Sequence, residues 1–345
     1  MKTPADFFDS FTLDIGRVLA ASAIFYFHAG RMLGILPLAR LGEFAVEYFV
    51  ILAGVTYLLF STSRPASLSD YASYFKKRLA ALFPLFLLVN VILYGASYGY
   101  PSGLGRPYSL AEFLASATGV SIYLDWKYLS SVMWFMPFIL QVYLLLPLID
   151  WCARRVHPVL LMLAAFAVSA FLAQMVPGFV SKTWIWGIVC KNWSPIFRLP
   201  EVCAGLILAR SVLTPGQGLP GIMALLVFGG LSFAVSSLKS AGVDLLVYLP
   251  WGGFLVPLII FLVSAWIAPG LRGVKPDRLR LLGLASFPFF LFHAAPLLAI
   301  SRRFGSQPFI WVLYFLACWL FSVGLTLFYA RVRNWAGDLA RRAEH

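Results

Sequence analysis

The chain has 345 residues, of which 12% are charged and 61% are hydrophobic, and its formal net charge is +13. A soluble domain has about 25% charged and 45–50% apolar residues, so this composition excludes an ordinary soluble protein and indicates a polytopic membrane protein. The basic residues stand in short stretches between apolar runs, as topology signals do, which argues against nucleic acid as a partner.

Apolar segments of nearly membrane-spanning length follow one another along the whole chain. Spanning helices need about 20 apolar residues, whereas the strands of a membrane barrel have about 9–11. We therefore expect an all-α polytopic integral membrane protein in a lipid bilayer, a single domain over residues 1–345 with no appended soluble domain. The ten expected segments are 11–30, 44–61, 80–98, 130–149, 157–177, 194–212, 219–237, 246–268, 280–300 and 309–331.

Lysine and arginine set the expected orientation. With the N-terminus inside, the inner loops hold more basic residues than the outer loops, notably at 76–78, 154–155, 272–280 and 331–342. Because basic loops stay on the cytoplasmic side, both termini are predicted to be cytoplasmic. The first segment has no cleavage site and should remain in the mature protein. The four cysteines lack metal-ligand spacing, so no metal site is expected.

The first apolar segment carries Asp14, Arg17 and His28. Arg17 and His28 are eleven residues apart, which is about 20° of rotation and about 16.5 Å of rise, so they share one helix face. Ionisable groups in hydrocarbon are costly and normally face a bundle interior or a water-filled cavity. Two structural alternatives remain: Arg17 pairs only with Asp14, and His28 is an interfacial histidine without chemistry.

Four more polar residues are predicted at the outer depth of His28: Glu47, Arg198, Glu201 and His293. Arg198 and Glu201 are neighbours on one helix face because they are three residues apart. Together these residues predict an outward polar cavity with acid, base and cationic groups. The alternatives are an Arg198–Glu201 clamp between helices, a Glu47 at headgroup level and a His293 that only packs.

The inner side is basic instead. Lys76, Lys77 and Arg78 open the third apolar segment at a level similar to Arg17. This arrangement suits the binding of an anionic cytosolic donor. It also suits simple positive-inside anchoring.

Five motifs give the chain a resemblance to the membrane acyltransferase 3 family. They are Arg17 to His28 with ten residues between; "YFVILAG" at 48–54, preceded by Glu47; "WFMPFILQVYLLLP" at 134–147; "RLPEVCAG" at 198–205; and "SFPFFLFHAAP" at 286–296. The chain departs from the family pattern in the third segment, where Ala81 replaces a second arginine, and in the fourth, where Gln141 stands in a stretch without an acid.

The resemblance implies an O-acyltransferase of the bacterial inner membrane. It would move an acyl group, with acetyl expected, from an acyl-coenzyme A co-substrate to a hydroxyl of a glycan acceptor, without a bound cofactor. His28 is expected to be the general base because imidazole titrates near neutral pH, with a covalent acyl-histidine as the alternative. Arg17 would bind the donor or orient the site, and Glu47 or Glu201 would orient an imidazole. Arg198 or His293 would stabilise the oxyanion.

The remaining expected contacts are with substrate. Trp134, Tyr143, Lys77 and Arg78 are expected to line the binding path, together with Arg198 and His293. A transporter or flippase for glycans or small solutes is the rival from another class, because charged residues in a membrane also mark transport paths. The chain shows no clear sequence repeat, which counts against a transporter. A signalling or scaffold protein is a third alternative. Burying five charged or histidine residues in the membrane costs free energy that such a function does not require.

Overall fold

The fold was analysed in a computed structural model. The structure describes residues 9–34, 42, 45–60, 67–99, 106–121, 129–130, 132–179, 194–213, 223, 227, 229–230, 255–271, 273–305 and 307–343. Within these residues the secondary structure is helical, and no strand occurs. The all-α prediction is confirmed for this part of the chain.

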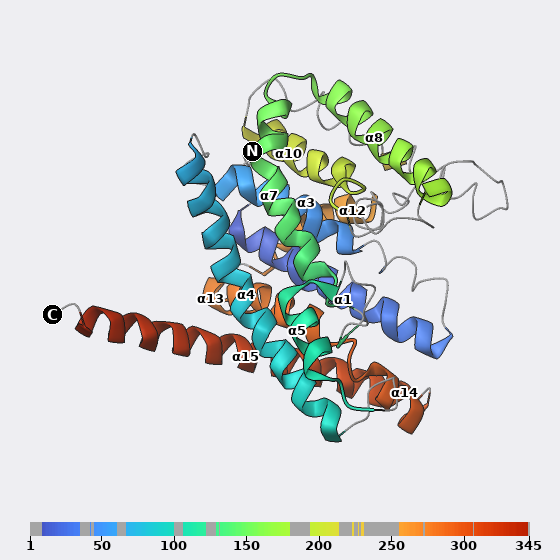
Figure 1. The fold of residues 1–345 in the computed structure, drawn as a ribbon, viewed down its shortest axis with the longest axis vertical. Helices are drawn as coiled ribbons and strands as arrows, with labels where there is room; N and C mark the ends of the chain where they lie inside the picture. Colours follow the sequence, from blue (N-terminus) through green and yellow to red (C-terminus); the bar gives the residue numbers. More distant parts are fainter. Residues whose placement is uncertain are drawn as a thin grey trace.

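Most of the expected apolar segments contain a helix in the described residues, although the ten-segment topology itself stays a prediction. They are α1 (Ser10–Leu33), α3 (Ala45–Phe60), α4 (Leu68–Gly99), α5 (Leu110–Thr118), α7 (Phe135–Ala153), α8 (Pro158–Phe179), α10 (Leu199–Leu213), α12 (Leu255–Ile267), α13 (Pro276–Phe292), α14 (Leu297–Phe304) and α15 (Pro308–Ala343) (Figure 1). Helices α1, α4, α7 and α15 are long and apolar enough to cross a membrane. The segment expected at 219–237 lies almost wholly outside the described residues.

Three details differ from the sequence prediction. Helix α4 begins well before residue 80, so Lys76, Lys77 and Arg78 lie inside a helix rather than at its start. The connection at 99–129 contains the short helix α5, whose Ser109 and Glu112 form a reciprocal capping box. The segment at 280–300 is broken into α13 and α14.

Pro296 explains the break between α13 and α14. Proline has no backbone N–H, and its ring clashes with the helical carbonyl four residues earlier, so a helix interior rarely tolerates it. Residues 293–296 form a turn at this point. His293 therefore stands at the C-terminal end of α13 instead of in the middle of a spanning helix.

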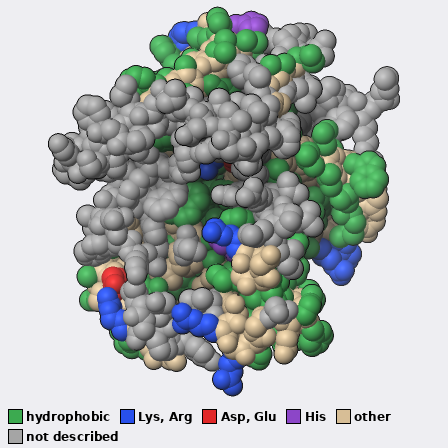
Figure 2. All heavy atoms as spheres, turned by 90° about the vertical axis from the view of Figure 1, so that its right-hand side faces the viewer, with side chains coloured by type: hydrophobic (Ala, Val, Ile, Leu, Met, Phe, Trp, Pro, Cys, Tyr) green, Lys and Arg blue, Asp and Glu red, His purple; other side chains and the backbone are tan. Residues whose placement is uncertain are grey.

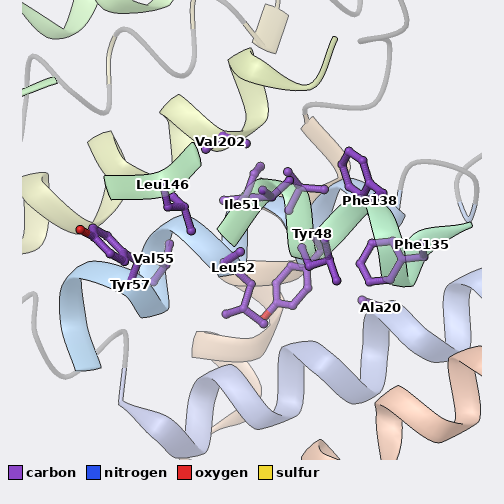
Figure 3. Packing of buried hydrophobic residues seen from close by; sticks show 14 of the residues in the cluster. Ala20, Tyr48, Ile51, Leu52, Val55, Tyr57, Phe135, Phe138, Leu146 and Val202 are labelled. Atoms are coloured by element: carbon purple, nitrogen blue, oxygen red, sulfur yellow. The ribbon is translucent and has the colours of Figure 1, made fainter. Parts of the chain in front are cut away.

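Helix α3 forms the centre of the bundle. Most of its side chains are buried, as expected for a helix that is apolar on all sides. Figure 3 shows Tyr48, Ile51 and Val55 of α3 facing side chains from α1, α7 and α10. Helix α1 packs against α13, α12 and α3, and α13 packs against α15. This packing brings residues from distant parts of the sequence to one end of the bundle.

Candidate active site

The expected site residues gather at one end of the helix bundle. Helix α1 ends, and α3 and α10 begin, toward the right-hand side of Figure 1. Figure 2 views the molecule from that side and shows basic side chains near the centre of this face. The end of α1 carries His28, the starts of α3 and α10 carry Glu47 and Glu201, and the end of α13 carries His293.

One arginine binds two carboxylates at this end. Arg198 Nη1 lies 3.0 Å from Glu47 Oε1 and 3.0 Å from Glu201 Oε1. The Glu47 and Glu201 side chains are only 2% and 0% exposed, and that of Arg198 is 15% exposed. A carboxylate taken out of water needs a hydrogen-bonded partner of opposite charge, and Arg198 supplies one to both. The pairing of Arg198 with Glu201 is confirmed, and Glu47 joins it from another helix.

A backbone contact between two glycines holds this ion cluster together. A Cβ atom at Gly54 would lie 3.0 Å from the backbone nitrogen of Leu206, and one at Gly205 would overlap the carbonyl of Ile51. Only glycine permits α3 and α10 to approach so closely. The crossing lies about two helical turns from both charged residues, so Glu47 in α3 and Arg198, which directly precedes α10, lie at the same level.

The two histidines form a second group. The ring centroids of His28 and His293 lie 5.2 Å apart, with an angle of 53° between the ring planes. His28 is half-buried, whereas His293 is fully buried. Phe25 and Phe289 contact the His293 ring from α1 and α13. This geometry confirms the prediction that the two histidines, which belong to different helices, lie close together.

Arg17 lies farther down α1 and pairs with Asp14. The Asp14 side chain lies against the backbone of Gly283 in α13, where a Cβ atom would overlap the carboxylate. Asp14 is buried, and the Arg17 side chain remains 27% exposed. The Asp14 pairing that the sequence left open as an alternative is present, and part of the Arg17 side chain stays exposed.

Arg78 lies between two tyrosine rings. Its guanidinium carbon is 5.5 Å from the ring centroid of Tyr74 and 5.4 Å from that of Tyr143, within the range of cation–π attraction. Arg17 is also close enough to Tyr143 to interact with it electrostatically. Arg17, Arg78 and Tyr143 therefore belong to one region, on three different helices. Lys77 is exposed on the outside of α4.

Trp134 and Gln141 make contacts with neighbouring residues of α7. Trp134 directly precedes α7 and packs against the rings of Phe135 and Phe138, with centroids 5.9 and 5.7 Å away. The Gln141 amide donates to the backbone carbonyl of Pro137 at 3.2 Å. The Trp134 side chain thus packs at the start of α7, and its role in substrate binding stays a prediction.

The sequence interpretation missed an ion network at the other end of α7. Asp150 is fully buried; Arg210 Nη2 donates to its Oδ1 at 2.6 Å, and Arg154 Nη2 lies 3.0 Å from its Oδ2. Arg210 also donates to the last carbonyls of α7, including that of Ala153. The only sequence signal was an acid inside an apolar segment, and sixty residues separate it from Arg210.

These features define a class of protein. In the part that the structure describes, the chain is an all-helical membrane protein with buried charged and histidine side chains at one end of its bundle. Among the residues that the structure describes, no three His, Cys, Asp or Glu side chains gather as metal ligands would.

The family follows from a comparison with known proteins. The chain matches the family model described as an acyltransferase domain over residues 11–331, and it belongs to the acyltransferase 3 family. No curated protein and no solved structure gave a significant match. The family membership establishes a membrane acyltransferase in general terms.

Proposed function

We propose that this membrane acyltransferase transfers an acyl group, acetyl in the first instance, from acyl-coenzyme A to a hydroxyl of a cell-surface or secreted glycan at the bacterial inner membrane. The observation that carries the proposal is the half-buried imidazole of His28, which lies directly beside a second imidazole. An alcohol attacks a thioester slowly unless its proton is removed, and a positioned imidazole removes it near neutral pH.

The ion cluster is proposed to stabilise the negative charge of the transition state. Arg198 uses one nitrogen, Nη1, for both Glu47 and Glu201. An arginine has five N–H donors, so further donors remain on the guanidinium for a developing oxyanion. In this proposal, Glu47 and Glu201 are positioning residues for Arg198, a different role from orienting an imidazole.

The donor is proposed to enter from the opposite, basic side. Coenzyme A is cytosolic and carries phosphates, which guanidinium groups bind well. Arg78 and the exposed Lys77 would hold the phosphates, and Arg17 would stand along the path of the thioester arm. Arg17 and His28 are about 16.5 Å apart along α1, a separation that an extended arm must span.

The direct test uses purified protein, acetyl-coenzyme A labelled in the acetyl group, and surface glycans from a strain that lacks the gene. Label that becomes ester-linked to glycan supports the proposal. Movement of glycan across a vesicle membrane without label transfer would contradict it and favour a transporter.

A further inference from the structure

The position of one hydrogen on His293 is fixed by its surroundings. His293 Nδ1 lies 2.8 Å from the carbonyl oxygen of Phe290 and 3.2 Å from that of Phe289. Carbonyl oxygens carry no hydrogen, so Nδ1 must carry one and donate it. A neutral imidazole has only one N–H, and Nε2 of neutral His293 therefore has a lone pair and can only accept.

Nε2 of His293 is buried and has no hydrogen-bond partner among the described residues. A buried acceptor without a partner costs about 1–3 kcal/mol. Native proteins contain few such atoms, and each calls for an explanation. The free lone pair belongs to the residue whose ring lies next to His28.

The packing holds this acceptor rigidly. The ring of Phe289 stacks on His293 with centroids 5.8 Å apart and an angle of 14°. The hydroxyl of Tyr314 donates to the backbone carbonyl of His293, which has no helical partner because α13 ends there. Helices α1, α13 and α15 thus fix the position of one lone pair.

We propose that His293 is a positioning residue that accepts an N–H hydrogen bond from His28 and so selects the tautomer of His28; this inference rests on the proposed function. Two imidazoles joined by an N–H···N bond of about 3 Å have centroids roughly 5 Å apart. The observed 5.2 Å fits that distance, so a turn of the His28 ring completes the bond.

The consequence for the reaction is a lone pair that faces the substrate. With its hydrogen directed at His293, His28 has its free lone pair on the opposite nitrogen. That nitrogen takes the proton of the glycan hydroxyl while the oxygen bonds to the thioester carbonyl carbon. The C–S bond then breaks, the proton passes to the thiolate, and free coenzyme A and the glycan ester remain. A neutral histidine thus performs the orienting task that a carboxylate has in serine hydrolases.

Two near-isosteric substitutions test the roles of the two His293 ring nitrogens one at a time. In His293→Asn the amide nitrogen replaces Nδ1 and keeps the bonds to Phe289 and Phe290, but the acceptor at the Nε2 position is lost. In His293→Gln the amide reaches the Nε2 position, and its oxygen can accept from His28. We expect kcat for transfer from acetyl-coenzyme A to the surface glycan fraction to fall roughly 100-fold in His293→Asn, with KM unchanged. In His293→Gln we expect kcat within tenfold of the unsubstituted protein.

A second measurement needs no substrate. In ¹⁵N-histidine NMR spectra, His293 should show a protonated Nδ1, and His28 should show one tautomer. His28 should become a mixture of tautomers in His293→Asn and return to one tautomer in His293→Gln.

Equal kcat in the Asn and Gln variants, a change in KM alone, or a His28 tautomer that is the same in all three proteins would overturn the inference. The NMR result does not depend on acyl transfer. It therefore shows whether His28 donates a hydrogen bond to His293 even if no label reaches the glycan. Absence of label with the unsubstituted protein would instead refute the proposed function.

Discussion

Gly54 of α3 and Gly205 of α10 are in backbone contact, and each lies seven residues after a charged residue of the ion cluster. Seven residues are about two helical turns, so the crossing sets Glu47 and Arg198 at one level. The same contact leaves no room for a side chain on either helix. The geometry of the cluster therefore depends on two residues that do not touch it.

We expect Gly205→Ala to separate α3 and α10 and to weaken the Arg198–Glu47 bond. The new methyl group would meet the carbonyl of Ile51, which cannot move aside as a side chain could. Overpacking of this kind costs about 1–3 kcal/mol. A thermal unfolding assay in detergent should show a lower midpoint and lower transfer activity. Gly324→Ala in α15 is the matched control, because nothing lies within 4 Å of its Cβ position.

Arg198→Ala should destabilise the protein strongly. It leaves Glu47 and Glu201 buried without their shared cation, and breaking a buried pair in this way costs about 3–5 kcal/mol. Adding Glu47→Gln and Glu201→Gln to Arg198→Ala should restore much of the stability. If Arg198 also stabilises the oxyanion, the triple variant should fold but remain inactive. Full activity in a stable triple variant would show that the cluster is only a structural clamp.

Arg78→Ala should raise the KM for acetyl-coenzyme A about tenfold and change kcat little. The guanidinium lies between Tyr74 and Tyr143. Its removal takes away, from a defined position, the cation that is proposed to bind the donor phosphates. Arg278→Ala, at an exposed position near the start of α13, is the control for general positive charge. An equal rise in KM in both variants, or none in either, would favour positive-inside anchoring.

The start of α5 should respond to acid. The hydrogen bonds from Arg106 and then from the backbone of Ser109 lower the pKa of Glu112 to about 2. A lowered pKa means that the stabilisation is present above the ordinary glutamate value of about 4.3 and is lost as the pH falls toward 2. Amide hydrogen exchange in the first turn of α5 should accelerate over that range. In Arg106→Ala the acceleration should begin at higher pH; an unchanged profile would contradict the assignment.

Much of the helical architecture could be predicted from the sequence, because apolar runs of spanning length have few other solutions in a membrane. The Arg198–Glu201 pair was also predictable, since their spacing places both on one face. Glu47 could be placed at the right depth, but its bond to Arg198 depends on how two helices cross. The same is true of Asp150 and Arg210, which are far apart in the chain.

The break at Pro296 was harder to predict, because the apolar run continues through it. Its effect is decisive for His293, which stands at a helix end with a fixed N–H and a free lone pair. Hydrogen positions of this kind depend on the carbonyls around the ring and not on the sequence motif. That an unpartnered acceptor belongs to the ring beside His28 became visible only in the structure.

The most direct test of the account is the kcat of His28→Ala for acetyl transfer from labelled acetyl-coenzyme A to the surface glycan fraction. His157→Ala is the matched control, because His157 is an exposed histidine between α7 and α8. The account predicts a loss of at least about 100-fold in His28→Ala at normal protein level, and no loss in His157→Ala. Unchanged transfer by a folded His28→Ala protein would contradict the central claim that this imidazole is the general base.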